Sequence, residues 1–222
     1  PRAIAAGDFG GDGRIQFAVG IQVDGAYKLA IFPSRNPTGE IVTYLVGVKA
    51  IRHLAPGDFD GDGNLDVVTM SRSDVFVLLN EGGTFSESRG VVAGDRLGDI
   101  RVRDIDGDGN LDLALADYER GEVMVLLGEG NGTFAFSDNP QAIEEPRTLA
   151  LGDIDGDGLV DIVTANRASD DLSIILNAGG GKFRPATPLA LPGADRPQHV
   201  VAADFDGDGD LDIAVGVDGD PV

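Results

Sequence analysis

The chain has 222 residues, of which 42% are hydrophobic, so it is long enough to bury a sizeable core, and its lack of cysteine excludes disulfide and thiol chemistry. Acidic residues outnumber basic ones by 38 to 17, and the formal net charge of −21 disfavours binding to the phosphate backbone of nucleic acids. The sequence has no apolar run of the roughly 18 residues that a membrane helix needs, so we expect no membrane insertion.

A nine-residue pattern, D-x-D-G-D-G-x-x-D, recurs along the chain. A degenerate copy at Asp8–Gln16, called the worn loop below, comes first. Intact copies follow at Asp58–Asp66, Asp104–Asp112, Asp153–Asp161 and Asp204–Asp212. The first aspartates of successive copies are 50, 46, 49 and 51 residues apart. A fixed period of this length indicates a repeat architecture. We therefore divide one domain, residues 1–222, into repeats at about 1–49, 50–95, 96–144 and 145–195, with a partial repeat at 196–222.

In the first repeat the pattern is incomplete. Gly10 and Gln16 occupy positions 3 and 9, which leaves Asp8 and Asp12 as the remaining carboxylates, so we expect weak cation binding there or none. Pro33 interrupts the third strand of this repeat, and the turn that follows it, PSRNPTGE, lacks the glycine block of the later repeats. Terminal repeats often diverge in this way.

The second repeat shows the order of elements most clearly. We predict strands at 51–55, 65–70, 75–79 and near 85–92, with a glycine turn at 80–84. The third repeat follows the same order with IRVRDI, LDLALA, VMVLL and a strand at Phe134, and the fourth with TLALGDI, VDIVTA, LSIIL and a strand at Phe183. The fifth repeat has residues for two strands only.

The runs VFVLL, VMVLL and LSIIL are apolar on both faces, which requires sheets to stack on both sides. Small residues in the second strands, such as Ala114, Ala116, Ala165, Ala214 and Gly216, suit close packing between neighbouring sheets. We therefore predict an all-β fold, a β-propeller of four-stranded antiparallel blades, with four blades and half of a fifth. Open blade edges would favour self-association.

The spacing of the aspartates suits a hard divalent cation such as calcium, which takes six to eight oxygens at about 2.3–2.6 Å. Positions 1, 3 and 5 supply alternate carboxylates, position 7 a backbone carbonyl, and position 9 a carboxylate that closes the site, plausibly with both oxygens. Glycine at position 6 permits the sharp turn, and glycine at position 4 keeps the loop thin. The predicted ligands are Asp58, Asp60, Asp62, Asn64, Asp66, Asp104, Asp106, Asp108, Asn110, Asp112, Asp153, Asp155, Asp157, Leu159, Asp161, Asp204, Asp206, Asp208, Asp210 and Asp212.

Two other interpretations of the loops are weaker. A single Asp/Gly cluster is ordinarily a solvated turn, but four intact copies at a near-constant period argue against that. An EF-hand loop shares the D-x-D-x-D-G opening but runs to a glutamate at position 12 and is flanked by helices. Here position 9 begins runs such as LDVVTM and LDIAVG, which are typical of strands.

The units resemble FG-GAP/VCBS repeats, a family found in integrin α-chain propellers, propeller-type fungal lectins and many bacterial surface proteins. The resemblance rests on GDFDGDGNLD and on the later blocks VLLNEGGTF, VLLGEGNGTF and IILNAGGGKF, and it covers essentially the whole chain. It implies that each loop joins the first two strands of a blade and binds calcium, with about four sites in all. It also implies that these blades belong to a larger ring of about seven.

We expect no catalytic residues. His53 and His199 are the only histidines and occupy equivalent positions ahead of their acidic loops, which favours a structural role. Connections on the side away from the loops carry Arg52, Arg72, Arg96, Arg120 with Tyr118, Arg147, Arg167 and Arg196. These arginines would attract carboxylates or acidic sugars, or they would form solvated charges and salt bridges between blades.

We therefore interpret the chain as a calcium-binding repeat module for adhesion, or for binding a protein or glycan, outside the cell. The extracellular location follows because calcium loops of extracellular modules bind at about 10⁻⁴–10⁻³ M. The alternatives are a propeller segment of a polysaccharide-processing lyase or hydrolase, and a spacer without a ligand of its own.

Overall fold

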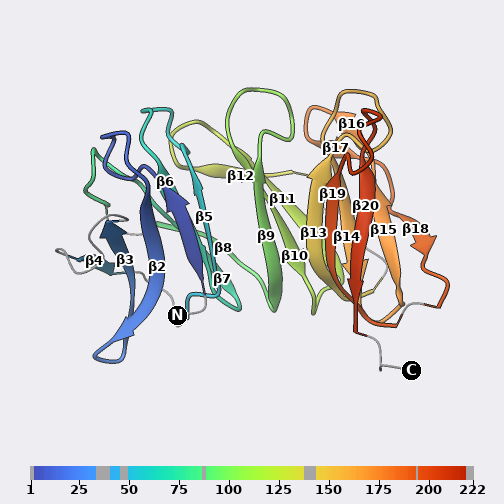
Figure 1. The fold of residues 1–222 in the computed structure, drawn as a ribbon, viewed down its shortest axis with the longest axis horizontal. Coiled ribbons are helices and arrows are strands. Elements are labelled where there is room, and N and C mark those ends of the chain that lie inside the picture. The colour runs from blue at the N-terminus through green and yellow to red at the C-terminus, as the bar shows by residue number, and fades with distance from the viewer. Residues whose placement is uncertain are drawn as a thin grey trace. The chain divides into compact units, whose positions relative to one another are not determined.

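The computed structural model describes residues 3–33, 41–45, 50–86, 89–137, 144–193 and 195–218. Throughout these ranges the regular secondary structure is β, without any helix, which confirms the predicted all-β class (Figure 1). Within the same ranges there is accordingly no apolar helix of membrane-spanning length. Most of the predicted turn of the first repeat, residues 34–40, falls outside the described residues.

The chain divides into two compact units. The first unit is Pro1–Gly94 with Gly128–Thr133, and the second is Asp95–Leu127 with Phe134–Val222. Each contains whole four-stranded sheets, and each is described by itself below.

The first unit contains two antiparallel sheets, one from each of the first two repeats. The first sheet has the order β1 (Ile4–Gly7), β2 (Gln16–Val23), β3 (Ala26–Pro33) and β4 (Val42–Leu45). The second has the order β5 (His53–Gly57), β6 (Asp66–Met70), β7 (Asp74–Leu78) and β8 (Arg89–Ala93). In both, consecutive strands pair, as the short connections predict.

The second unit contains the sheets of the remaining repeats. The third repeat forms β9 (Leu97–Arg103), β10 (Asp112–Asp117), β11 (Glu122–Gly128) and β12 (Phe134–Phe136), although Gly128 itself groups with the first unit. The fourth forms β13 (Pro146–Gly152), β14 (Asp161–Asn166), β15 (Asp171–Ile175) and β18 (Thr187–Ala190), with a small hairpin of β16 (Asn177–Gly179) and β17 (Lys182–Phe183). The fifth contributes the pair β19 (Pro197–Ala203) and β20 (Asp212–Val217).

The outermost strand of the third repeat, β12, lies at Phe134 as predicted, whereas those of the second and fourth repeats begin later than predicted. In the second repeat, Phe85 forms only an isolated bridge with Asn80, and the paired strand begins at Arg89. In the fourth repeat, Phe183 lies in the small hairpin and the outer strand begins at Thr187. In both repeats the residue after the glycine turn pairs back with the asparagine that begins it, Phe85 with Asn80 and Phe183 with Asn177. The outer strand that pairs with the sheet therefore begins a few residues later.

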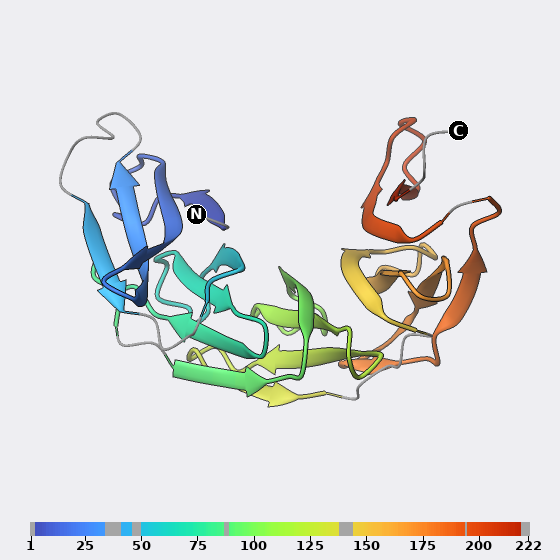
Figure 2. The ribbon, with the colours of Figure 1, turned by 90° about the horizontal axis from the view of Figure 1, so that it is seen from below.

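Within each unit the first strands of successive sheets lie next to one another: β1 beside β5, β9 beside β13, and β13 beside β19. Figure 2 shows the two sheets of the first unit side by side. Second strands are the most buried elements, because every residue of β6, β10 and β14 is buried. Antiparallel four-stranded sheets that stack through their faces in this way are propeller blades, so the predicted β-propeller architecture of four blades and half of a fifth is confirmed.

The apolar cores lie between neighbouring blades. Phe9, Leu29, Ile51, Val67 and Leu78 join the first and second blades. A similar core of Ile105, Ala114, Ala116, Leu149 and Ile162 joins the third and fourth, and one of Ala150, Val163, Ala165, Leu172 and Val200 joins the fourth to the β19–β20 pair. Ala114, Ala116 and Ala165 are fully buried, as expected for small residues at a close blade contact. Ala214 and Gly216, in contrast, are exposed on β20.

Candidate metal centres

Each intact acidic loop connects the first strand of a blade to the second. The pairing of β5 with β6 ends on Gly57 opposite Asp66, and that of β13 with β14 ends on Gly152 opposite Asp161. Position 9 is therefore the first residue of the second strand, and positions 1 to 8 form the loop. Asp112 in β10 and Asp212 in β20 have the same placement. Strands, rather than helices, thus flank the loops, which excludes the EF-hand arrangement.

The position-1 aspartate curls the loop around its own carboxylate. Asp58 accepts the N–H of Gly61 at 2.8 Å and that of Gly63 at 3.0 Å. Asp104 and Asp204 make the same two contacts with the glycines of their loops. The glycines at positions 4 and 6 of the four intact loops all have positive φ, between 75° and 98°. A side chain at these positions would strain the turn, which explains the D-G-D-G pattern.

The curled loops bring carboxylate oxygens together. In the second and third repeats, oxygens from positions 1, 3 and 5 lie within 4.8 Å of one another, in the groups Asp58, Asp60, Asp62 and Asp104, Asp106, Asp108. In the fourth and fifth repeats the groups are Asp153, Asp155, Asp161 and Asp204, Asp206, Asp212, from positions 1, 3 and 9. Two oxygens bound to one calcium ion at about 2.3–2.6 Å are at most about 5 Å apart, so all four groups have a suitable spread.

In the second, third and fourth repeats the position-9 carboxylate is buried, whereas Asp212 in the fifth is exposed. Asp66 is fully buried, and its two oxygens accept the N–H groups of Phe59 at 2.8 Å and Asn80 at 2.7 Å. Asp161 accepts those of Ile154 and Asn177, both at 2.8 Å. Each oxygen of Asp66 therefore keeps one lone pair for a cation. Coordination by both oxygens of position 9 stays a prediction.

Several loop carboxylates have perturbed pKa values. Burial raises the pKa of Asp66 to about 6, against the lowering effect of the two backbone N–H groups that it accepts, and the charges of Asp60 and Asp62 add to the rise. Burial also raises the pKa of Asp161 and that of Asp60, the latter helped by the charges of Asp62 and Asp58. The Asn64 backbone N–H lowers the pKa of the exposed Asp62. Crowded carboxylates of this kind favour a bound cation.

One buried oxygen gives a direct test of whether a cation fits. Asp153 Oδ2 accepts the N–H of Gly158 at 2.9 Å, whereas Asp153 Oδ1 is buried without a hydrogen-bond partner among the described residues. A buried carboxylate oxygen without a partner is costly unless a cation binds it. Asp153 also belongs to the convergent group with Asp155 and Asp161, so the donors fit a hard cation.

Position 7 can supply a backbone carbonyl. The side chains of Asn64 and Asn110 donate to the position-5 carboxylates, Asp62 at 2.7 Å and Asp108 at 2.9 Å. These amides are therefore engaged with the loop, and Leu159, the fourth-repeat residue, has only its carbonyl to offer. The ligand role of position 7 stays a prediction.

The worn loop of the first repeat has the same curl but a different charge arrangement. Asp8 accepts the N–H groups of Asp12 at 3.1 Å and Gly13 at 2.7 Å. The Arg14 guanidinium lies 3.3 Å from Asp12 and supplies a positive charge within the loop itself. The sequence analysis missed Arg14, although its place at position 7, in a loop with fewer carboxylates, was a signal that could have found it.

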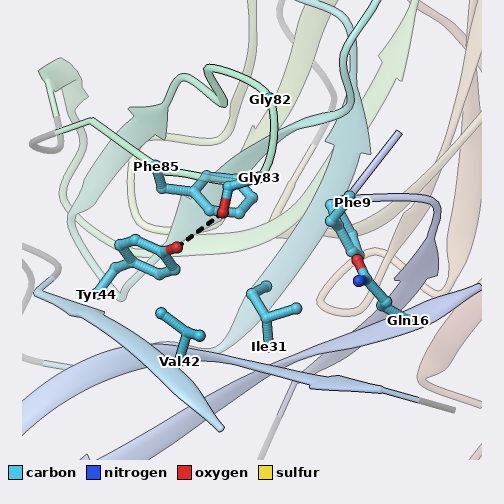
Figure 3. Close-up of a pocket in the computed structure, with 9 residues that line it drawn as sticks. Phe9, Gln16, Ile31, Val42, Tyr44, Gly82, Gly83 and Phe85 are labelled. Carbon is cyan, nitrogen blue, oxygen red and sulfur yellow. Dashed lines mark hydrogen bonds between the residues drawn. The ribbon is translucent and has the colours of Figure 1, made fainter. Parts of the chain in front are cut away.

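A cavity of about 230 Å³ lies beside the worn loop in the first unit. Figure 3 shows Phe9, Tyr44 and Phe85 around it, with the Tyr44 hydroxyl donating to the Gly83 carbonyl at 3.0 Å. The ring of Tyr44 meets that of Phe85 edge-on at 5.0 Å. The lining also includes Gly10 and Gln16, which stand at positions 3 and 9 of the worn loop, where the intact loops have aspartates.

The predicted arginines are partly brought together in the second unit. The Arg96 guanidinium lies 4.6 Å from the centre of the Tyr118 ring, and that of Arg147 lies 5.9 Å from it. Arg120 pairs with Asp95 at 2.9 Å, and Arg96 pairs with Glu119 at 3.8 Å. A hollow of about 430 Å³ is lined by Arg96, Arg120 and Tyr118 among others, so these two arginines form both ion pairs and the wall of a concave surface.

Arg167 lies beside this hollow, because its N–H donates to the carbonyl of Glu145, which lines it, at 3.2 Å. Arg196 is 3.9 Å from its neighbour Asp195. His53 begins β5, and His199 lies in β19 opposite Gly216. The two histidines hold equivalent strand positions, and their structural role stays a prediction.

Comparison with known proteins gives one sequence family. The family model described as FG-GAP-like repeat matches three times, over residues 58–115, 104–164 and 153–215, which together span more than half of the chain. Each match begins at the first aspartate of an intact loop. No curated protein matches the chain.

Several solved structures have a similar fold. BBS1N, solved in complex with ARL6DN, aligns with a TM-score of 0.67 at 15% identity over 97% of this chain and 62% of its own. A Bacteroides uniformis protein described as a candidate 6-phosphogluconolactonase aligns with a TM-score of 0.60 at 18% identity, over 89% and 56%. A Photorhabdus luminescens Tc holotoxin pore aligns with a TM-score of 0.50 at 22% identity, over 98% and 11%. The chain thus spans less than two thirds of each of these structures.

Proposed function

This chain belongs to the FG-GAP-like repeat family, and on that premise we propose that it is a calcium-binding β-propeller module that binds a protein or a glycan outside the cell. The observation that supports calcium most directly is the repeated convergence of three carboxylates within 4.8 Å in four loops. All the donors are oxygens, which hard cations prefer and softer transition metals do not.

The role that we propose for calcium is structural. Bound calcium would neutralise the loop that joins the first two strands of each blade, and the position-9 aspartate would carry this effect into the buried second strand. Four dications would reduce the formal net charge of −21 to −13, which lowers self-repulsion in the folded state. A fully ligated site of this kind leaves no open position for a substrate.

We propose the extracellular location from the calcium affinity expected of such loops. Calcium loops of extracellular modules bind at about 10⁻⁴–10⁻³ M, concentrations that occur outside cells. Exposed loops that carry three or four carboxylates and are flanked by strands rather than helices suit calcium binding of this low affinity.

For ligand binding, we propose the hollow over Tyr118. It combines an aromatic ring stacked under Arg96 with nearby carboxylates, so it offers both stacking and hydrogen bonding to a polar partner. BBS1N, which has a similar fold, was solved in complex with ARL6DN, so a fold of this kind is able to present a surface to a protein.

A binding screen in calcium tests this proposal. The chain should be applied to a glycan array and to an extracellular protein panel, and each hit assayed in parallel for new reducing ends or unsaturated sugar products. We expect saturable binding that Tyr118→Ser weakens at least tenfold. Phe136→Ser is the matched control, because Phe136 is an aromatic residue of the same blade that is 60% exposed and lies outside the hollow. Turnover of a bound polysaccharide, or equal loss in both variants, would contradict the proposal.

A further inference from the structure

Two buried asparagines occupy the same place in their repeats. Asn80 follows β7 in the second repeat and Asn177 follows β15 in the fourth, and each is only 1% exposed. A buried amide must find partners for its two donors and its acceptor, so the partners reveal what the residue does.

Asn177 links its own acidic loop to the loop of the preceding blade. Its backbone N–H donates to Asp161 Oδ1 at 2.8 Å, which holds the position-9 carboxylate of the fourth-repeat loop. Its side-chain amide donates to the carbonyl of Val160, position 8 of that loop, at 3.0 Å, and to the carbonyl of Ile105 at 2.8 Å. Its Oδ1 accepts the N–H of Gly179 at 2.9 Å. Every polar group of the side chain is therefore engaged.

Ile105 completes the connection on the other side. It is position 2 of the third-repeat loop, it is 1% exposed, and its N–H donates to Asp112 Oδ2 at 2.7 Å. A continuous set of buried hydrogen bonds thus runs from Asp112 through Ile105 and Asn177 to Asp161. Both ends of this set are the position-9 carboxylates of acidic loops.

We propose that Asn177 is a positioning residue that couples the acidic loops of the third and fourth repeats, so that calcium binding at one raises the affinity of the other. This inference rests on the proposed calcium function. The physical reason is that a loop ordered around a cation holds Ile105, and with it the carbonyl that Asn177 needs, in one place. Asn177 then holds Asp161 ready for the neighbouring site, and by thermodynamic reciprocity the effect acts in both directions.

The chain itself provides a matched comparison. Asn80 makes the corresponding hydrogen bonds. Its backbone N–H donates to Asp66 Oδ1 at 2.7 Å, and its side-chain amide donates to the carbonyls of Leu65 and Phe9, both at 2.9 Å. Its Oδ1 accepts the N–H of Gly83 at 2.8 Å. Phe9, however, belongs to the worn loop, which lacks carboxylates at positions 3 and 9. Asn80 therefore has the same packing and hydrogen bonds but no second intact site to couple.

The third repeat has no such side chain. Gly128 stands at the equivalent place, and the contact to the second-repeat loop is made instead by the N–H of Gly132, which donates to the Phe59 carbonyl at 2.9 Å. Among the described residues, an asparagine side chain thus joins two intact acidic loops only at Asn177.

Site-resolved calcium titration tests the coupling. The backbone amides of Gly109 and Gly158 donate to the position-1 carboxylates of the two loops, so their NMR signals report each site separately. In the unaltered chain the two titrations should be coupled, and Asp106→Asn, which disables the third-repeat site, should raise the half-saturation concentration at Gly158 on the order of tenfold. Because this comparison leaves residue 177 unchanged, it remains decisive even if a variant at 177 fails to fold.

The double-mutant cycle identifies the residue responsible. In the Asn177→Ala background, Asp106→Asn should leave the half-saturation concentration at Gly158 unchanged, whereas in the Asn80→Ala background it should still produce the tenfold rise. An undiminished rise in Asn177→Ala, or no rise in the unaltered chain, would overturn the coupling while leaving calcium binding intact. If neither glycine signal responded to calcium, the proposed function itself would fail.

Discussion

Asp62 and Asp12 hold the same loop position, yet their surroundings differ. Asp62 belongs to a group of three carboxylates with Asp58 and Asp60, whereas Asp12 is paired with Arg14. We therefore predict that Asp62→Ala removes one calcium site and that Asp12→Ala removes none. Calorimetry should give close to four sites for the unaltered chain, three for Asp62→Ala and four for Asp12→Ala. A stoichiometry that Asp62→Ala leaves unchanged would refute the ligand assignment.

The raised pKa of Asp66 predicts a pH dependence with a definite sign. Burial lifts this pKa from the ordinary 3.8 to about 6, so the folded chain without metal holds the proton more tightly than the unfolded chain. The resulting stabilisation is complete below the ordinary value and is lost as pH rises through about 6. Calcium requires the ionised carboxylate, so calcium affinity should increase over the same pH range.

Titration of the Asp66 carboxyl carbon by NMR checks this prediction. The metal-free chain should show a pKa near 6, and saturating calcium should move it well below 4. An ordinary Asp66 pKa without metal, or no change on adding calcium, would show that burial does not govern this carboxylate.

At the level of single residues, the sequence predicted the four acidic loops and their glycines because the pattern repeats. It did not predict Arg14, Asn177 or Asp153 Oδ1 as special. The place of Arg14 at position 7 of its loop was a local signal, whereas Asn177 contacts the backbone of another blade, and such a contact has no signature in local spacing. The unpartnered Asp153 oxygen depends on burial, which a single sequence does not give.

Blade-to-blade packing depends on a close approach of neighbouring first strands. A Cβ added at Gly98 in β9 would lie 2.7 Å from the backbone carbonyl oxygen of Arg147 in β13, and a backbone atom cannot move aside cheaply. We predict that Gly98→Ala destabilises the second unit by about 1–3 kcal/mol. Gly216→Ala is the control, because the nearest atom to its added Cβ, on His199, is at 3.7 Å.

Urea denaturation of both variants, followed by circular dichroism, measures the difference. Gly98→Ala should lower the free energy of unfolding, and Gly216→Ala should change it by less than about 0.5 kcal/mol. Equal effects would mean that β9 and β13 do not pack as closely as described.

The inner strands of the blades were well predicted from sequence, whereas the outer strands of the second and fourth repeats were placed too early. β6 and β14 contain β-branched residues, β10 contains leucine and alanine, and all three strands are buried on both faces, so an uninterrupted apolar run predicts them well. The outer strands are short and exposed, as in β18, where all residues are exposed, and their positions depend on how the preceding glycine turn closes. Turn closure is set by contacts with the neighbouring blade, which local sequence does not specify.

The β19–β20 pair leaves apolar side chains exposed in the described structure. Phe205, at position 2 of its loop, is 61% exposed, whereas Phe59 and Ile105 at the same position are 3% and 1% exposed. We predict that this chain self-associates in a concentration-dependent way and that Phe205→Ser weakens the association. Sedimentation velocity over a range of concentrations checks this, and a monomer at every concentration would contradict it.

For the molecule as a whole, the central claim is that calcium in the acidic loops stabilises the stacked blades. Sixteen of the 38 acidic residues of the chain occupy the carboxylate positions of four loops, so removal of calcium should leave concentrated negative charge at the start of the second strand of each of these repeats. At calcium concentrations of about ten to a hundred times the dissociation constant, each site should add about 1–3 kcal/mol. The acidic loops on which this prediction rests are evident from the sequence, whereas the buried hydrogen bonds that Asn177 makes to two of them are not.

Thermal unfolding of the same preparation, in chelator and in 10 mM calcium, tests this claim most directly. The account predicts that calcium raises the Tm by about 10 °C or more. An identical Tm in chelator and in calcium would contradict it.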